Sequence, residues 1–103
     1  METDRELLEL AAKAVGVPVM GFNADNEVEC ADGGWWKPLN DFCESIEIAH
    51  ELGLEVPFTD GSVIVLEIGE SVVLAEEPCS MYAHVAFMRA VVRAAAEIGR
   101  AMP

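Results

Sequence analysis

The chain has 103 residues, enough for one domain with a core, and 52% of them are hydrophobic, which excludes an intrinsically disordered protein. Its 6 basic and 19 acidic residues give a formal net charge of −13. So acidic a chain is unsuited to direct binding of nucleic acid or anionic lipid, because both require a cationic surface. We therefore expect a single globular domain over residues 1–103 that binds neither nucleic acid nor a membrane.

The N-terminus and the cysteines indicate where the protein works. The chain begins with acidic residues, unlike the basic start of a signal peptide, and no apolar stretch approaches the ~20 residues of a membrane-spanning helix. The three cysteines, Cys30, Cys43 and Cys79, include no closely spaced pair, so we expect reduced thiols. Together these features predict a cytoplasmic protein.

Residues 3–16 carry the signals of a helix with both ends marked. Thr3 and Glu6 have the spacing of a capping box, in which each side chain binds the backbone N–H of the other residue. Leucine, alanine and valine residues then recur at helical spacing. Gly16 and Pro18 end the predicted helix.

The next segment predicts short strands rather than a helix. Residues 17–22 form a short expected strand, and the alternation over 27–30 is typical of an edge strand. Trp35 and Trp36 follow a glycine pair. Because neighbouring residues of an extended chain point to opposite sides, we expect one of these tryptophans in the core. The other is either packed as well or exposed as an anchor for a partner.

A second helix is predicted from Asn40 or Asp41 to Gly53, with a capping residue at its start. Its apolar stripe, which we expect to face the core, is Phe42, Ile46, Ala49 and Leu52. The glutamates expected on a different side are Glu44, Glu47, Glu51 and Glu55.

Residues 62–68 and 71–76 predict two strands joined by Gly69 and Glu70, a pair that favours a type II′ hairpin turn. Both faces of this hairpin are apolar, so we expect both to be covered. A final helix follows, with Ser80 as its cap and a pair between Arg93 and Glu97 on its exposed side. The apolar stripe of this helix is Met81, Val85, Met88, Val91, Val92, Ala95, Ile98 and Met102.

The predicted order of elements is therefore α-β-α-β-β-α. It implies an α+β fold in which a small antiparallel β-sheet of about three strands is covered by helices on both faces. The side chains expected to be nearly fully buried are Ile64, Leu66, Val91 and Ile98.

No group of residues predicts catalysis or metal binding. Cys79 and His84 are five residues apart without a third group to orient them, and the cysteines, His50 and His84 lack the spacing of zinc ligands. The carboxylates are too numerous for any pair to indicate acid–base chemistry. We expect a protein that is not an enzyme and that has no cofactor and no metal.

The acidic charge is concentrated in one part of the chain. Residues 20–78 contain 14 acidic residues and a single basic one, Lys37. Unpaired like charges on adjacent turns of a helix cost a few tenths of a kcal/mol, and a cationic partner would remove that cost. The candidate partner-binding residues are Glu44, Glu47, Glu51, Glu55, Asp25, Glu27, Glu29, Asp32 and Trp35.

Three blocks of the sequence resemble small phage and prophage proteins of the phage ABA sandwich domain family. They are the opening segment 3–8, the segment from Trp36-Lys37-Pro38-Leu39-Asn40-Asp41 to Leu54, and the closing segment 89–99. The resemblance implies an α–β–α sandwich and assigns no activity and no catalytic residue.

Two functions of different classes follow from these features. The first is an interaction protein that blocks a basic, nucleic-acid-binding site on a host bacterial protein, such as an anti-CRISPR or other anti-defence inhibitor. The alternative is a phage accessory or structural-assembly protein, for example a homodimer, in which the acidic residues serve only solubility. Ionic strength distinguishes them, because salt weakens an electrostatic complex and leaves a hydrophobic dimer intact.

Overall fold

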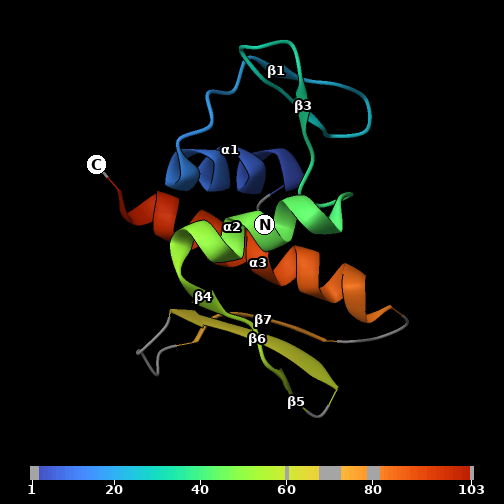
Figure 1. Cartoon of the computed structure of the whole chain (residues 1–103), viewed down its shortest axis with the longest axis vertical. Helices are drawn as coiled ribbons and strands as arrows, with labels where there is room; N and C mark the ends of the chain where they lie inside the picture. The colour runs from blue at the N-terminus through green and yellow to red at the C-terminus, as the bar shows by residue number, and fades with distance from the viewer. Residues whose placement is uncertain (1–2, 60, 68–72, 79–81, 103) are drawn as a thin grey trace.

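The computed structural model describes residues 3–59, 61–67, 73–78 and 82–102. Within these residues the protein has an α+β fold, in which three helices lie between two small antiparallel sheets (Figure 1). The helices are α1 (Asp4–Val15), α2 (Phe42–Leu52) and α3 (Ala83–Ala101). The strands are β1 (Gly21–Phe22), β2 (Val28–Glu29), β3 (Trp35–Trp36), β4 (Leu54–Glu55), β5 (Phe58–Thr59), β6 (Ser62–Glu67) and β7 (Val73–Pro78).

The first helix forms as the sequence predicts. The Thr3 hydroxyl accepts from the Glu6 N–H at 3.2 Å, and the Glu6 carboxylate accepts from the Thr3 N–H at 3.3 Å. At the other end Gly16 adopts a left-handed conformation with φ 77°, which a residue with a side chain rarely takes up. At each end of the helix, the residues that stabilise it are thus only a few positions apart in the sequence.

The first sheet is a three-stranded meander in the order β1-β2-β3. The predicted edge position of the strand near residues 27–30 is wrong, because β2 lies between β1 and β3 and its Val28 is fully buried. Each of the three strands has only two residues, so the short alternation over 27–30 cannot show whether β2 lies at the edge or in the middle of the sheet.

The second sheet is three strands wide. Its central strand β6 pairs with β7 along one edge and with the short strands β4 and β5, one after the other, along the opposite edge. The predicted turn at Gly69 and Glu70 lies outside the described residues. The expectation of one sheet is therefore wrong, since the chain forms two, in the order α-β-β-β-α-β-β-β-β-α.

The predicted layering, a sheet covered by helices on both faces, is also wrong. Val63 and Val65 are fully buried on the face of β6 that packs on α3, whereas Ile64 and Leu66 on the other face are only half-buried. The described helices all lie on the side of β6 that packs on α3 (Figure 1). The outer face tolerates exposure because it is not purely apolar: Ile64 stands opposite Glu76 of β7.

The core lies between α1, α2, α3 and the inner faces of the two sheets. α1 packs more extensively on α3 than on any other element, and the fully buried alanines of α3 allow the two helices to approach closely. Of the residues predicted as nearly fully buried, Val91 is confirmed. The expectation is wrong for Ile64, Leu66 and Ile98, which remain half-buried.

The inward side of α2 also differs from the prediction. The buried residues are Ser45, Ile48 and Ala49, whereas Phe42 and Ile46 of the expected core stripe are 40% and 44% exposed. Ser45 can be buried because its hydroxyl donates to the carbonyl of Phe42 at 2.7 Å within the same helix.

In the last helix, the middle residues of the predicted apolar stripe are buried and the described residues nearest its ends are exposed. Met88, Val91, Val92 and Ala95 are buried, whereas Val85 and Met102 are exposed. The expected cap, Ser80, and the first member of the stripe, Met81, lie outside the described residues.

Candidate functional site

No metal-binding cluster is found among the described residues. They include no cluster of three or more His, Cys, Asp or Glu side chains that could hold a metal ion. Cys30 and Cys43 are free thiols. Cys79 lies outside the described residues. No helix in the same ranges is long and apolar enough to cross a membrane.

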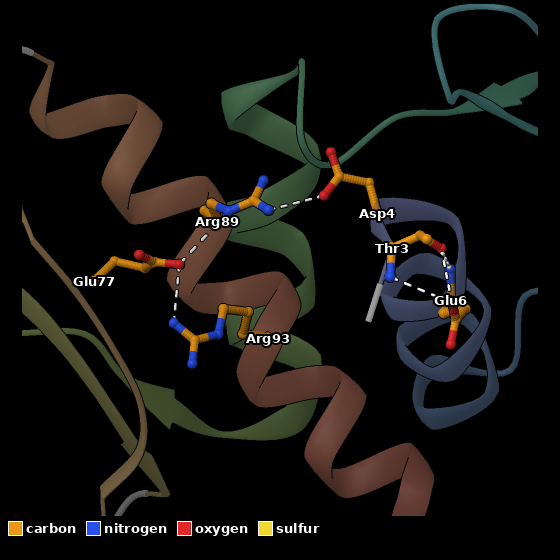
Figure 2. A network of polar contacts seen from close by, with 6 residues as sticks. All are labelled: Thr3, Asp4, Glu6, Glu77, Arg89 and Arg93. Carbon is orange, nitrogen blue, oxygen red and sulfur yellow. Dashed lines mark hydrogen bonds and ion pairs between the residues drawn. The ribbon is translucent and has the colours of Figure 1, made fainter. Parts of the chain in front are cut away.

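Two arginines of α3 share one carboxylate of β7 (Figure 2). Arg93 donates to Glu77 at 2.9 Å, and Arg89 lies 3.6 Å from the same oxygen. Arg89 also donates to Asp4 of α1 at 2.8 Å, and this hydrogen bond raises the pKa of Arg89. The predicted pair between Arg93 and Glu97 is wrong, because Arg93 turns to β7 instead. The network ties α1, α3 and β7 together.

The remaining basic side chains are engaged elsewhere. Arg100 pairs with Glu97 at 3.3 Å, one turn away on α3. The other contacts are Arg5 to Asn26 at 2.8 Å, Lys13 to the carbonyl of Met102 at 3.0 Å, and Lys37 to Glu27 at 4.0 Å. All six lysines and arginines of the chain thus have partners away from the outer side of α2.

Three of the predicted site residues form what we call the acidic ridge: Glu47, Glu51 and Glu55. Glu47 and Glu51 are exposed on adjacent turns of α2, and Glu55 is exposed on β4 directly after that helix. Among the described residues, no lysine, arginine or histidine nitrogen comes within 4.0 Å of these carboxylates. The ridge therefore carries uncompensated negative charge.

Glu44 serves a different purpose from the ridge. Its side chain is half-buried, and its Oε2 accepts from the Lys37 backbone N–H at 2.6 Å. Burial raises the pKa of Glu44, an effect that this hydrogen bond opposes. At the same helix start, the Asp41 carboxylate accepts from the Cys43 N–H at 2.9 Å. Glu44 thus fixes the chain entering α2.

The other predicted site residues lie on the first sheet and its turns, beyond α1 from the second sheet (Figure 1). Glu27 accepts from Asn23 at 2.7 Å, and Asp32 accepts from the Gly34 N–H at 2.9 Å. These two acids therefore stabilise turns. The exposed members of this group are Asp25, Glu29, Asp32 and Trp35.

The two tryptophans point to opposite sides, as their extended backbone predicts. Trp36 is half-buried against the core, while Trp35 is 45% exposed opposite Glu29 of β2. The structure thus separates the predicted site residues into two groups, one on the first sheet and one along α2 and β4.

Sequence reasoning missed a group of apolar side chains beside the acidic ridge, three of them exposed and one half-buried. We call it the aromatic patch and define it as Phe42 and Ile46 of α2, Phe58 of β5 and Phe87 of α3. The Phe87 ring centroid lies 4.9 Å from that of Phe42 and 6.4 Å from that of Phe58. Phe58 is 57% exposed. The apolar spacing of α2 was the only signal for this group, and it equally fits a buried stripe.

Comparison with known proteins identifies no relative: no protein-family model, curated protein or solved structure matches this chain. Its function must therefore be inferred from its own residues. What they define is an α+β protein with an unpaired acidic ridge next to an exposed aromatic patch.

Proposed function

We propose that this chain is a small, non-catalytic binding protein of phage type. It occupies a basic, nucleic-acid-binding site on a host bacterial protein, in the cytoplasm, as an anti-CRISPR or other anti-defence inhibitor would. The phage setting is part of the proposal and rests on the sequence resemblance in the segments 3–8, 36–54 and 89–99.

The observation that carries the proposal is the acidic ridge. Glu47, Glu51 and Glu55 are exposed, and each lysine and arginine of the chain has a partner elsewhere. A surface that serves only solubility normally interleaves both signs of charge. A helix that presents carboxylates in fixed positions suits a groove lined by lysine and arginine, where it competes with nucleic acid for the same cations.

The competing function is an accessory or assembly protein that forms a homodimer. The aromatic patch favours some form of interface, because contiguous exposed apolar groups mark interaction sites. A dimer held by that patch would tolerate salt, whereas a complex held by the ridge would not.

The test is a ridge variant, Glu47→Gln/Glu51→Gln/Glu55→Gln, with circular dichroism to confirm folding. Its matched control, Glu9→Gln/Glu67→Gln/Glu76→Gln, removes the same charge from exposed positions on α1, β6 and β7. Glu44 is left intact, because its carboxylate holds the start of α2.

Each immobilised protein is exposed to bacterial lysate at low salt. The wild type and the control variant should retain nucleic-acid-binding proteins, which excess DNA or about 0.5 M salt releases. The ridge variant should retain none of them. Equal retention of the same proteins by the wild type and the ridge variant would show that the ridge is not the binding surface.

A further inference from the structure

We infer that the aromatic patch anchors the partner, and that the partner segment presents an apolar side chain flanked by lysine or arginine. This inference rests on the proposed function and adds the chemistry of the bound segment. The binding surface along α2 then combines two parts, the apolar anchor on one side and the acidic ridge on the other.

The first step is that the patch has the character of an interface anchor. Phe42, Ile46 and Phe58 are 40%, 44% and 57% exposed, and they come from two elements, α2 and β5. The half-buried Phe87 ring joins them, because it contacts the rings of both Phe42 and Phe58. Rigid aromatic groups that expose apolar area while their backs are packed lose little entropy on binding, and such groups dominate the affinity of protein interfaces.

The second step is that the patch and the acidic ridge are continuous. Phe42 and Ile46 lie on adjacent turns of α2, so their side chains are neighbours on the helix surface. Ile46 in turn lines a shallow depression together with Glu47, His50 and Glu51. A partner side chain seated on Ile46 therefore lies next to two carboxylates of the ridge.

The third step is charge complementarity, which selects the occupant. An apolar partner segment with acidic flanks would be repelled by Glu47 and Glu51, and a second copy of this chain would add another net charge of −13. A segment with basic flanks instead gains attraction at the ridge while its apolar part covers the aromatic patch. The geometry therefore favours a basic, partly apolar protein segment over a second copy.

Two synthetic peptides of equal length and equal positive charge probe this surface by calorimetry at low salt. One combines lysine with leucine, and the other combines lysine with serine. The wild type should bind the lysine–leucine peptide at least about tenfold more tightly, because only that peptide can bury apolar groups on the patch. Phe58→Ser should reduce the ratio of the two affinities to below about threefold. Met20→Ser, which changes a 64% exposed apolar residue before the first sheet, is the matched control and should leave the ratio unchanged.

The outcomes separate this inference from the proposed function. If both peptides bind equally and the ridge variant abolishes binding, the ridge stands and the anchor is refuted. If neither peptide binds the wild type, both are refuted. A wild-type ratio that Phe58→Ser leaves intact also overturns the anchor. Sedimentation of the protein alone tests the second copy: a dimer that Phe58→Ser dissociates would assign the patch to self-association and overturn the inference.

Discussion

The packing of α3 on α1 depends on a glycine. Gly99 of α3 packs against the backbone of α1, and a Cβ atom at this position would overlap the carbonyl oxygen of Leu10 and lie 2.8 Å from its carbonyl carbon. Ordinary carbon contacts are about 3.5–4.0 Å, so the helices would have to separate locally by about 1 Å. The obstacle is helix backbone, which cannot rotate away as a flexible side chain could.

Gly99→Ala should therefore destabilise the protein. Overpacking a well-packed contact costs about 1–3 kcal/mol, and the upper part of this range, about 2–3 kcal/mol, applies because helix backbone blocks the new Cβ atom. The higher helix propensity of alanine offsets about 1 kcal/mol of it. We expect a net loss of about 1–2 kcal/mol in the free energy of unfolding, which lowers the Tm of a domain this size by about 5–15 °C. The loss should be larger for Gly99→Val, because the larger side chain needs a wider separation.

Thermal and urea unfolding followed by circular dichroism measure this loss. The control is Glu9→Ala, which changes the exposed neighbour of Leu10 on α1 and should alter the free energy of unfolding by no more than about 0.5 kcal/mol. A Gly99→Ala variant with an unchanged or raised Tm would refute the close approach of α1 and α3 at this point.

Three further predictions concern single polar groups. Asp41→Ala should lower the free energy of unfolding by about 1 kcal/mol in urea titrations, because it removes the N-cap of α2. Glu77→Gln should lower the free energy of unfolding by about 1 kcal/mol at low salt and by less at high salt, because Arg89 and Arg93 both lose their ion pair with the Glu77 carboxylate. Burial raises the pKa of Glu44 in the folded protein above its ordinary value of 4.5, so protonation of Glu44 stabilises the folded state. This stability is fully present below pH 4.5 and is lost as the pH rises through the raised pKa of the folded state. Urea titrations across that pH range should show a smaller loss of stability in Glu44→Gln than in Glu47→Gln, the control that removes one charge from the exposed side of the same helix. Equal pH dependence of the two variants would contradict a raised pKa of Glu44.

The features that the sequence alone determined are local ones. The capping box of Thr3 and Glu6, the Asp41 cap and the terminating Gly16 and Gly53 were all predictable, because each acts on backbone groups within a few residues. The excess of acidic residues in the segment 20–78 was equally evident, since charge is a property of composition. The opposite orientations of Trp35 and Trp36 followed from the geometry of an extended chain.

The tertiary structure alone decided how these elements pack. Apolar spacing shows that α2 has apolar side chains at certain positions, but it cannot show which flank meets the core, and here Ser45 is buried while Phe42 and Ile46 are exposed. In the same way, an apolar strand can be covered on one face or on both, and only the position of α3 places Val63 and Val65 inside.

The candidate surface depended on the same long-range choices. Its acidic half was visible in the sequence, yet the burial of Glu44 depends on where the Lys37 backbone lies. Its aromatic half joins Phe42, Phe58 and Phe87 from three separate elements. No local pattern encodes that meeting, because it arises only when α2, β5 and α3 have packed together.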